Sequence, residues 1–600
     1  MRHTLFVIII VAACFMTAIL SLATSKTANS RIMGICAVIA IAVGIGSYGY
    51  GYSYKDGFSA SVVLKTLLTT CRMFGGIFDY SVVNGTPLFE HEAVKTLYWT
   101  GHFLAFYLTA NAAISVLGKR LMKHLRTAML RWGDMCLVYD ANPNSIRLTG
   151  ERRRGRAMVL VTERADESVS AMADALGGVE YPGGRALCAD DKFLQSIGVT
   201  GNHRPVDVYC IGDEPGRNLA YAEALLPALK ARGVRPETTS LFLLGVSEDQ
   251  AARLLAQDGR YGYGSLFACT QYDLIARLVV QKRPPWEFVS FDADGRARGD
   301  LRAMVVGFGR MGDAVLRQLI VNGQLEGSAF HAEVFDRRMD DLRGFVEACY
   351  PALLSNYDIA LHAADADSPL FYQRLAANTP SLIVLCTSTR KQNTELTEKL
   401  HLLYGSRPNR PCIIQCTPDS AIIDNVEYRL DIVDVRGMDR TAMILNHVYR
   451  GGPSPEADWR HCDAFSRASC RAAVDFFPAF LKAANVTPEE ATAGKWPPAP
   501  GVLENLSRTE HLRWCAFYMT MGYTPMSEAE FTSRCERYRR GEITRIAKNA
   551  DDLTHACLVP WEQLDALSQR ENAVTGGQVD YKAMDRNNVL AVPDILRQVG

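Results

Sequence analysis

The stretch AMVVGFGRMGDAVLRQLI, residues 303–320, joins an apolar run to a glycine-rich turn and then to an amphipathic segment. Gly307, Gly309 and Gly312 form the pattern GxGxxG where an expected strand gives way to an expected helix, which is the context that this motif requires. Gly307 permits a tight turn, Gly309 lets the backbone approach a pyrophosphate, and Gly312 allows close packing of helix against strand. The N-terminus of the helix would then present free N–H groups and a positive dipole to an anion.

Two acidic residues follow the next strands of this half. Asp336 ends HAEVFD, where a carboxylate would accept a hydrogen bond from a ribose hydroxyl, although GQLEGS lengthens the connection beyond the usual ~20 residues. Asp365 follows the third expected strand, at the end of the sheet where open sheets bind ligands. The sequence therefore predicts binding of NAD or another adenine nucleotide by Gly307, Gly309, Arg310, Met311, Gly312, Asp336 and Asp365. The alternative is a degenerate nucleotide-binding half that is kept for packing.

Short β-rich apolar runs alternate with helical stretches from Met135 onward, which is typical of parallel sheets covered by helices. The expected strands of the first half are 135–139, 158–162, 206–211, 241–245 and 266–269. Those of the second half are 303–307, 332–335, 359–363, 382–386 and 412–416. The predicted fold class is α/β, with two tandem Rossmann-like domains at 131–295 and 296–455.

The two halves resemble each other, which indicates an internal duplication. Residues 206–229 and 381–403 each give a strand, a polar turn ending in Asn218 or Asn393, and a helix. The first half has no glycine ladder after its first strand, where a phosphate would instead meet Asp140. One complete nucleotide motif per chain is therefore expected.

The N-terminal 118 residues are apolar and contain three uncharged or nearly uncharged runs, at 5–24, 32–52 and 97–118. Each is long enough to cross the roughly 30 Å hydrocarbon core of a bilayer as a helix. The densest basic cluster follows the third run and belongs in the cytoplasm, and it consists of Lys119, Arg120, Lys123, His124, Arg126 and Arg131. The sequence thus predicts a multi-pass protein of the cell (inner) membrane, with residues 1–130 in the membrane domain and the later domains in the cytoplasm.

Two features of this region have alternative interpretations. The first run also resembles a cleaved signal peptide, which would leave two spans. Residues 58–80 are amphipathic and would form a re-entrant or interfacial helix, with Lys65 and Arg72 on one face. The letters GIGSYGYGYSY at the end of the second run include those of a potassium filter, but a full span precedes them, and interfacial tyrosines explain them more simply.

Membrane spans followed by two Rossmann-like halves resemble the TrkA-N or RCK (regulator of potassium conductance) family. The resemblance covers roughly residues 130–450, and its clearest motif is Gly307–Gly312 with Asp336. It implies paired or ringed cytoplasmic nucleotide-sensing modules that are coupled to a potassium channel or transporter.

The C-terminal region, residues 501–600, follows an expected linker at 456–500 that contains WPPAPG. It resembles the ryanodine receptor (RyR) repeat, a small, mostly helical domain, through Glu510, His511, Trp514, Gly522, Tyr523, His555, Leu558, Val559, Pro560 and Trp561. The resemblance implies recognition of a ligand or partner. Trp514 and Trp561 would sandwich a ring and Arg508 and Arg513 would meet phosphate, so the expected ligand-binding residues are Arg508, His511, Arg513, Trp514, His555 and Trp561. The alternative is a small helical core in which the His and Trp side chains are satisfied internally.

Composition excludes several classes of protein. The 600 residues contain 65 basic and 65 acidic side chains, so the strong basic excess of a dedicated nucleic-acid binder is lacking. The 16 cysteines form neither a CxxC pair nor a Cys/His array, so no metal site is expected. No P-loop, GxSxG elbow or HExxH is present.

These observations favour an oligomeric, nucleotide-sensing ion channel or potassium-transport-type membrane protein over an enzyme. A homo-oligomer is expected because three short spans cannot easily enclose a pore. Two alternatives remain: a membrane-tethered NAD-dependent oxidoreductase, with acid–base candidates among His331, His362, Asp365 and Asp367, and an antiviral-type effector whose membrane part opens on a nucleotide signal.

Overall fold

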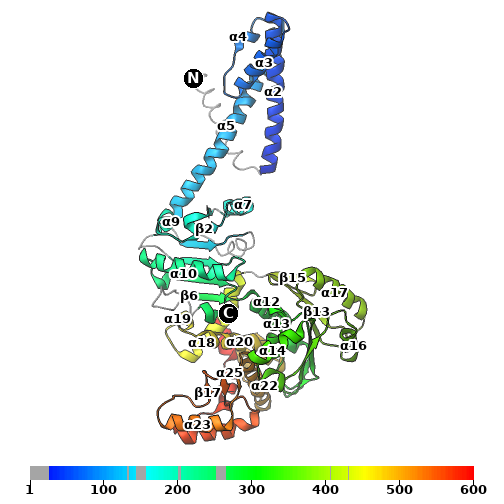
Figure 1. The fold of residues 1–600 in the computed structure, drawn as a ribbon, viewed down its shortest axis with the longest axis vertical. Coiled ribbons are helices and arrows are strands. Elements are labelled where there is room, and N and C mark those ends of the chain that lie inside the picture. Colours follow the sequence, from blue (N-terminus) through cyan, green and yellow to red (C-terminus); the bar gives the residue numbers. More distant parts are fainter. Residues whose placement is uncertain are drawn as a thin grey trace. The chain divides into compact units, whose positions relative to one another are not determined.

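The structure is a computed structural model that describes residues 26–130, 134–142, 157–176, 178–199, 205–251, 265–405, 407, 409–429 and 432–599. The chain forms two compact units, residues 1–129 and 130–600. Each is described by itself below (Figure 1). The apolar run at 5–24 lies outside the described residues.

The first unit is helical. Its elements are α2 (Lys26–Asp56), α3 (Ala60–Met73), α4 (Tyr80–Val83), η1 (Pro87–Glu90) and α5 (Glu92–Met129). Among the described residues, one helical segment, Met33–Asp56, is long and apolar enough to cross a membrane. It contains the expected second run. The expected third run lies within α5, and the structure does not establish a second or third crossing.

The polarity of this unit is inverted relative to a water-soluble helical bundle. Its interior contains polar groups: the Tyr48 hydroxyl lies 2.8 Å from His102 Nε2 and 3.0 Å from the Tyr98 hydroxyl. Large apolar side chains face outward instead, and Val38, Leu64 and Phe58 are 68%, 68% and 89% exposed. An apolar exterior of this kind is typical of a surface that contacts lipid or a partner.

The second unit begins with a parallel sheet of six strands in the order β3-β2-β1-β4-β5-β6. Its strands are β1 (Met135–Tyr139), β2 (Ala157–Thr162), β3 (Val179–Pro182), β4 (Val206–Cys210), β5 (Thr239–Leu244) and β6 (Ser265–Cys269). Alternate strand residues enter two separate hydrophobic clusters, so both faces of the sheet are buried. The covering helices include α7 (Glu167–Ala175), α8 (Gly184–Leu187), α9 (Asp191–Ser196), α10 (Pro215–Ala231) and α12 (Gln271–Lys282).

A second sheet follows, after a short hairpin of β7 (Ser290–Phe291) and β8 (Ala297–Arg298), in the order β11-β10-β9-β12-β13-β14-β15. Five parallel strands are β9 (Leu301–Val306), β10 (Phe330–Asp336), β11 (Asp358–Ala363), β12 (Leu382–Leu385) and β13 (Cys412–Cys416). The antiparallel hairpin β14 (Ser420–Ile423) and β15 (Val426–Arg429) closes the sheet. Its helices are α13 (Arg310–Asn322), α14 (Met339–Cys349), α15 (Leu353–Asn356), α16 (Pro369–Ala377) and α17 (Arg390–Tyr404).

All ten strands expected from the sequence are present within one or two residues, and the parallel α/β class is confirmed. The sequence reading missed β3 and the hairpin β14–β15. These strands are short, and β3 and β15 are only partly buried, so they lack the continuous apolar run that marks a strand covered on both faces.

The internal duplication reappears in one side-chain hydrogen-bond pattern. The Asn218 amide accepts from the Gly212 N–H at 3.0 Å and donates to the Leu244 carbonyl at 3.0 Å. The Asn393 amide accepts from the Thr387 N–H at 3.0 Å and donates to the Cys416 carbonyl at 2.9 Å. Each asparagine thus ties the turn after the fourth strand of its sheet to the end of the fifth.

The halves differ in the residue that follows their first strand, which is Asp140 after β1 and Gly307 after β9. Asp140 and Gly307 occupy equivalent positions and both have positive φ, +53° and +88°. A Cβ on Gly307 would lie 2.5 Å from the Cys386 carbonyl oxygen, next to Thr387, whereas Asp140 packs against Gly212, where any Cβ would overlap it. A side chain is therefore excluded at Gly307 by the facing backbone, whereas in the first half it is excluded at Gly212 by the Asp140 side chain.

Residues 456–500, expected as a linker, contain α19 (Pro455–Arg460), α20 (Ala464–Ala483), α21 (Pro488–Glu490) and η7 (Ala491–Lys495). The long helix α20 belongs to the main hydrophobic core because Val474, Phe477 and Phe480 are buried in it. The apolar side chains of α20 have the spacing of a buried helical face. The Pro/Gly-rich stretches on either side led to the prediction of a linker instead.

The C-terminal module contains α22 (Pro500–Thr520), β16 (Thr524–Pro525), α23 (Glu528–Arg539), β17 (Lys548–Asn549), β18 (Thr554–His555), η8 (Trp561–Gln563), α24 (Leu564–Thr575), α25 (Tyr581–Leu590) and α26 (Val592–Val599). Its first helix packs on α13, and the Thr509 hydroxyl accepts from the Glu326 N–H at 3.1 Å. The module therefore shares a core with the second sheet.

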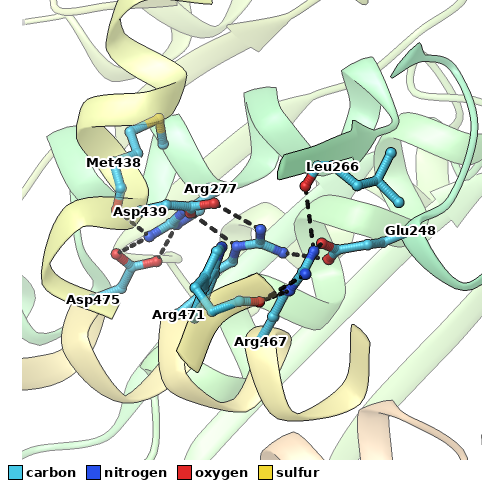
Figure 2. A network of polar contacts seen from close by, with 9 residues as sticks. Glu248, Leu266, Arg277, Met438, Asp439, Arg467, Arg471 and Asp475 are labelled. Atoms are coloured by element: carbon cyan, nitrogen blue, oxygen red, sulfur yellow. Dashed lines mark hydrogen bonds and ion pairs between the residues drawn. The ribbon is translucent and has the colours of Figure 1, made fainter. Parts of the chain in front are cut away.

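A buried network of ion pairs joins the first sheet region to α18 (Ile432–Arg450) and α20 (Figure 2). It contains three arginines and three acids, and all except Arg471 have side chains less than 10% exposed. Arg277 of α12 lies 2.9 Å from Asp439 and 2.5 Å from Asp475, and Arg471 bonds Asp439 at 2.9 and 2.7 Å through two nitrogens.

Glu248, which follows β5, completes the network by pairing with Arg467 and, at 2.9 Å, with Arg471. Burial alone would raise the pKa of Asp439, but Arg471 and Arg277 hold that pKa below its ordinary value. Asp439 is thus held charged, and the basic and acidic groups of the network are equal in number.

Replacing Arg471 with Met should destabilise the full chain by about 3 kcal/mol, because Asp439 and Glu248 would lose a buried counter-charge. Denaturant unfolding of the full chain in detergent, followed by tryptophan fluorescence, measures the loss. Lys391→Met removes an exposed pair with Glu395 and should cost less than about 1 kcal/mol. Equal effects of the two substitutions would contradict the structural role of the network.

The contact between Asp140 and Gly212 gives a second prediction. Gly212→Thr should destabilise the chain by about 1–3 kcal/mol because the new side chain overlaps Asp140. Adding Asp140→Gly removes the side chain that the substitution at Gly212 overlaps and should recover most of that loss. A double-mutant cycle of unfolding free energies measures the coupling, and strictly additive effects would refute the overlap.

Candidate functional site

The glycine turn has the geometry that the sequence pattern predicts. Gly307 follows β9 with φ +88°, and a Cβ on Gly312 would overlap the Gly307 carbonyl oxygen. Gly309 differs from both, since it is exposed and a Cβ built on it meets no atom within 4 Å. Gly307 and Gly312 are thus required by packing within the protein, whereas the space at Gly309 is open to a ligand.

The turn leads directly into α13, whose first backbone hydrogen bond runs from the Asp313 N–H to the Gly309 carbonyl at 3.0 Å. The N–H groups of Arg310, Met311 and Gly312 precede that bond and have no acceptor within the helix. Together with the helix dipole they favour an anion at this end of α13.

Asp336 reaches the turn in spite of the long connection that precedes β10. Its carboxylate accepts from the Phe308 N–H at 2.7 Å and from the Arg338 N–H at 2.8 Å. Each carboxylate oxygen has a second lone pair available. Asp336 therefore fixes the glycine turn and can also accept a hydrogen bond from a hydroxyl of a ligand.

Three arginines flank this turn, and only Arg310 was among the nucleotide-binding residues predicted from the sequence. Arg310 opens α13, and Arg337 and Arg338 follow Asp336; all three are exposed. Within the described part of the chain, no residue forms an ion pair with their guanidinium groups. Their positions directly after the acidic strand end and the glycine turn are the sequence signal that identifies them as phosphate-binding candidates.

Met311 and Asp365 do not join the site in the same way. The Met311 side chain is 6% exposed and packs in the hydrophobic core, so only its backbone N–H is available to a ligand. Asp365 is exposed and follows β11, which β10 separates from β9. Asp365 therefore lies one strand further from the turn than Asp336.

Three of the four acid–base candidates, His331, His362 and Asp367, are paired with residues outside the glycine turn. His362 Nε2 lies 2.9 Å from Glu333 and its ring stacks on Phe335, while His331 Nδ1 lies 2.6 Å from Asp358. Asp367 pairs with Lys399 at 2.7 Å. These contacts are between neighbouring elements, and among the described residues none places a His beside the glycine turn.

The C-terminal module borders a cavity of about 950 Å³. Helices α18, α20, α22 and α25 and the segment 544–557 contribute to its walls. Four of the six expected ligand-binding residues line it: His511, Arg513, Trp514 and His555. The other two do not, because Arg508 pairs with Glu562 at 2.5 Å and the Trp561 indole donates to Glu504 at 3.0 Å.

His511 carries a positive charge. Its Nδ1 lies 3.0 Å from the Asp585 carboxylate and its Nε2 lies 2.8 Å from the Val559 carbonyl oxygen. Both neighbours are acceptors, so both ring nitrogens must donate, which only the imidazolium does. Burial alone would lower the pKa of His511, but the contact with Asp585 raises it to about 11.

The other three expected residues that line the cavity, Arg513, His555 and Trp514, also contact neighbouring side chains or backbone groups. Arg513 is 1% exposed and binds Glu510 through two hydrogen bonds of 2.7 Å. Burial lowers the pKa of His555 to about 3, and its neutral Nδ1 accepts from the Cys557 N–H at 3.1 Å. Trp514 lies parallel to the His511 ring and edge-on to His555.

The chain was compared with known proteins at three levels. No family model matches it, and no curated protein matches it. The solved structures that it resembles include "Crystal structure of the GsuK bound to ADP", at 14% identity over 65% of this chain and 90% of that chain, and "GsuK Channel", at 13% identity over 64% and 76%. Both have a TM-score of 0.30, which is too low to establish a common fold, so the fold assignment rests on the strand order.

The charge on His511 predicts a pH-dependent stability. A pKa raised from 6.5 to about 11 stabilises the folded chain fully below pH 6.5, and this contribution declines as the pH rises towards 11. His511→Asn retains a donor to Asp585 but does not titrate. The difference in unfolding free energy between wild type and His511→Asn should therefore shrink from pH 6 to pH 9.

Denaturant unfolding at several pH values measures this difference. The exposed His461 provides a matched control, because His461→Asn removes a histidine on the surface of the same unit. A difference between wild type and His511→Asn that stays constant from pH 6 to pH 9 would contradict the imidazolium assignment.

Proposed function

We propose that this protein is a membrane-embedded, oligomeric ion channel or potassium-transport-type protein that an adenine nucleotide controls. The nucleotide would bind at the glycine turn of the second sheet. The observation that carries this proposal is the open Gly309 backbone at the N-terminus of α13, with Asp336 bonded to the same turn. This arrangement offers N–H groups to a diphosphate and a carboxylate to a ribose hydroxyl.

The arginines beside the turn support a phosphorylated ligand. Arg310, Arg337 and Arg338 are exposed and would meet phosphate oxygens with planar, multiply donating groups. NAD and ADP share the adenosine diphosphate portion that this chemistry recognises. The ligand class is therefore an adenine nucleotide.

The first unit supports a membrane location. Outward apolar side chains on α2, α3 and α5 surround an interior that includes tyrosine, threonine and histidine beside apolar residues. Such a surface is costly in water and is stabilised by lipid. The proposed topology is multi-pass in the inner membrane, with the second unit in the cytoplasm and several copies of the chain enclosing the ion path.

Ligand binding can act on the membrane unit only if the ligand prefers one of two conformations. The chain offers a short covalent path, because α5 ends at Met129 and β1 begins at Met135. The first sheet is tied in turn to α18 and α20 by the buried ion pairs, and these helices pack in the core of the second sheet. A change at the glycine turn would therefore be transmitted through packed elements.

Gly309→Asp tests the ligand site. The new side chain meets open space, so the fold should be retained, but its carboxylate would repel a phosphate at the helix N-terminus. The affinity of the detergent-solubilised chain for ADP and NAD, measured by calorimetry, should fall at least about tenfold. Gly344→Asp adds the same charge at an exposed position of α14 with equally open space and should leave the affinity unchanged.

Ion flux tests the output. Vesicles that contain wild-type protein should show potassium flux that changes on addition of ADP or NAD, and Gly309→Asp should abolish that change. Turnover of NADH without flux would favour the oxidoreductase. Flux that responds to cyclic nucleotides and is blind to ADP and NAD would favour the antiviral-type effector. Unchanged ADP and NAD binding by Gly309→Asp would overturn the site.

A further inference from the structure

We infer that the C-terminal cavity is a second ligand site, separate from the glycine turn, for an anionic molecule that carries a flat ring, of the adenine nucleotide class. Three elements of different chemistry converge on it: a lysine without an ion pair, a rim of arginines, and aromatic walls. None of them is used by the glycine turn.

The size of the cavity suits a small molecule. Its volume of about 950 Å³ lies at the upper end of the range in which small-molecule sites occur. It is bounded by α18 and α20 on one side and by the C-terminal module on the other. A ligand there would contact both.

Lys548 is the central cation. Its Nζ lies 3.9 Å from the centre of the Phe465 ring and 5.2 and 5.3 Å from those of Tyr518 and Tyr523. Its hydrogen-bond partner within the described residues is the Tyr518 hydroxyl at 3.5 Å, and no carboxylate there lies within ion-pair distance. Burial lowers the pKa of Lys548, and Asp463 opposes that effect from beyond ion-pair distance. A half-buried ammonium group without a direct ion pair is unfavourable, so the site is prepared for an anion.

The remaining charges in the cavity leave a positive surplus. Asp585 pairs with His511, Glu510 pairs with Arg513, and Glu571 accepts from the Tyr581 hydroxyl. Arg450 and Arg545 line the cavity as well and are exposed. Among the described residues neither forms an ion pair. Glu571 has a neutral partner, so three cations without an ion pair, Lys548, Arg450 and Arg545, face one acid without one in the lining.

Two buried side chains retain polar atoms without hydrogen-bond partners. Arg513 and Asn446 are 1% and 3% exposed and line the cavity. No described residue bonds Arg513 Nη1 or Asn446 Oδ1. Both atoms are themselves inaccessible to solvent, so they lie behind the cavity wall, and the ligand contacts come from the cations and the rings.

The walls provide ring surfaces. Trp514 is half-buried and lines the cavity together with Phe465, Tyr518 and Tyr581. Aromatic walls with cations beside them match a molecule that has a flat base at one end and phosphate at the other. An anion without a ring would leave the aromatic walls without a stacking partner. A neutral ring would leave Lys548, Arg450 and Arg545 without a counter-charge.

The test is ADP binding to the full chain in detergent, measured by calorimetry in variants of each site. Wild type should bind two ADP per chain. Lys548→Met keeps the stem in its aromatic surroundings, removes the charge, and should weaken one event by at least about tenfold. Arg545→Ala, at an exposed side chain, should weaken the same event severalfold, and Lys391→Met, at a surface lysine of α17, should change neither event.

The outcomes separate this inference from the proposed function. One ADP per chain, lost in Gly309→Asp and retained in Lys548→Met, overturns the cavity and leaves the glycine turn in place. One ADP per chain with the opposite pattern supports the cavity and refutes the turn. Absence of ADP binding to wild type overturns the ligand class for both. An unchanged melting temperature of Lys548→Met shows that a lost event is not misfolding.

Discussion

The structure of the second unit depends on the buried ion pairs between α12, α18, α20 and the segment after β5. Three arginines and three acids are buried together. The cost of desolvating each charge is compensated only while all its partners stay in place. An apolar interface tolerates small shifts, but a guanidinium bonded to two carboxylates does not. The network thus fixes α20 against the first sheet. The same helix packs in the core of the second sheet and contributes Phe465, Ser469 and Cys470 to the cavity wall, so the position of that wall relative to both sheets is set by electrostatics.

The duplicated halves show how one structural constraint can be kept while a site is lost. The asparagine contacts after the fourth strands are the same in both sheets, because a buried turn needs its N–H and carbonyl groups paired. The contact at the end of the first strand differs, because backbone atoms of Cys386 and Thr387 exclude a side chain at Gly307, whereas the Asp140 side chain excludes one at Gly212. The second half places the glycine in the turn and leaves the backbone open, whereas the first half places the glycine opposite and fills the turn with the Asp140 side chain. A carboxylate at that position also repels phosphate, so the two halves share a fold and differ in what they can bind.

The C-terminal module is neither a detached domain nor a simple extension of the second sheet. Its first helix shares the core of that sheet, while its later elements stand across the cavity from α18 and α20. Its charged residues are of two kinds. His511 and Arg513 form buried pairs with Asp585 and Glu510, whereas Lys548 lies among aromatic rings without an ion pair. The first kind holds the elements of the module together. The second kind is the reason to expect a ligand.

The sequence by itself determined the ten parallel strands, because strands buried on both faces read as continuous apolar runs, and it determined the glycine turn with Asp336, because a turn and the strand after the next helix are close in both sequence and space. It also indicated the duplication through Asn218 and Asn393. Only the tertiary structure decided the rest. Residues 456–500 contain core helices because one apolar face of α20 packs in the hydrophobic core, in spite of the prolines that flank the segment. Trp561 and Arg508 were expected at a ligand and are instead satisfied by Glu504 and Glu562. Asn446, Phe465 and Lys548, which are spread over about a hundred residues of the chain, line one cavity. No local pattern carries that information, since which side chain faces a partner is decided by how helices distant in sequence pack.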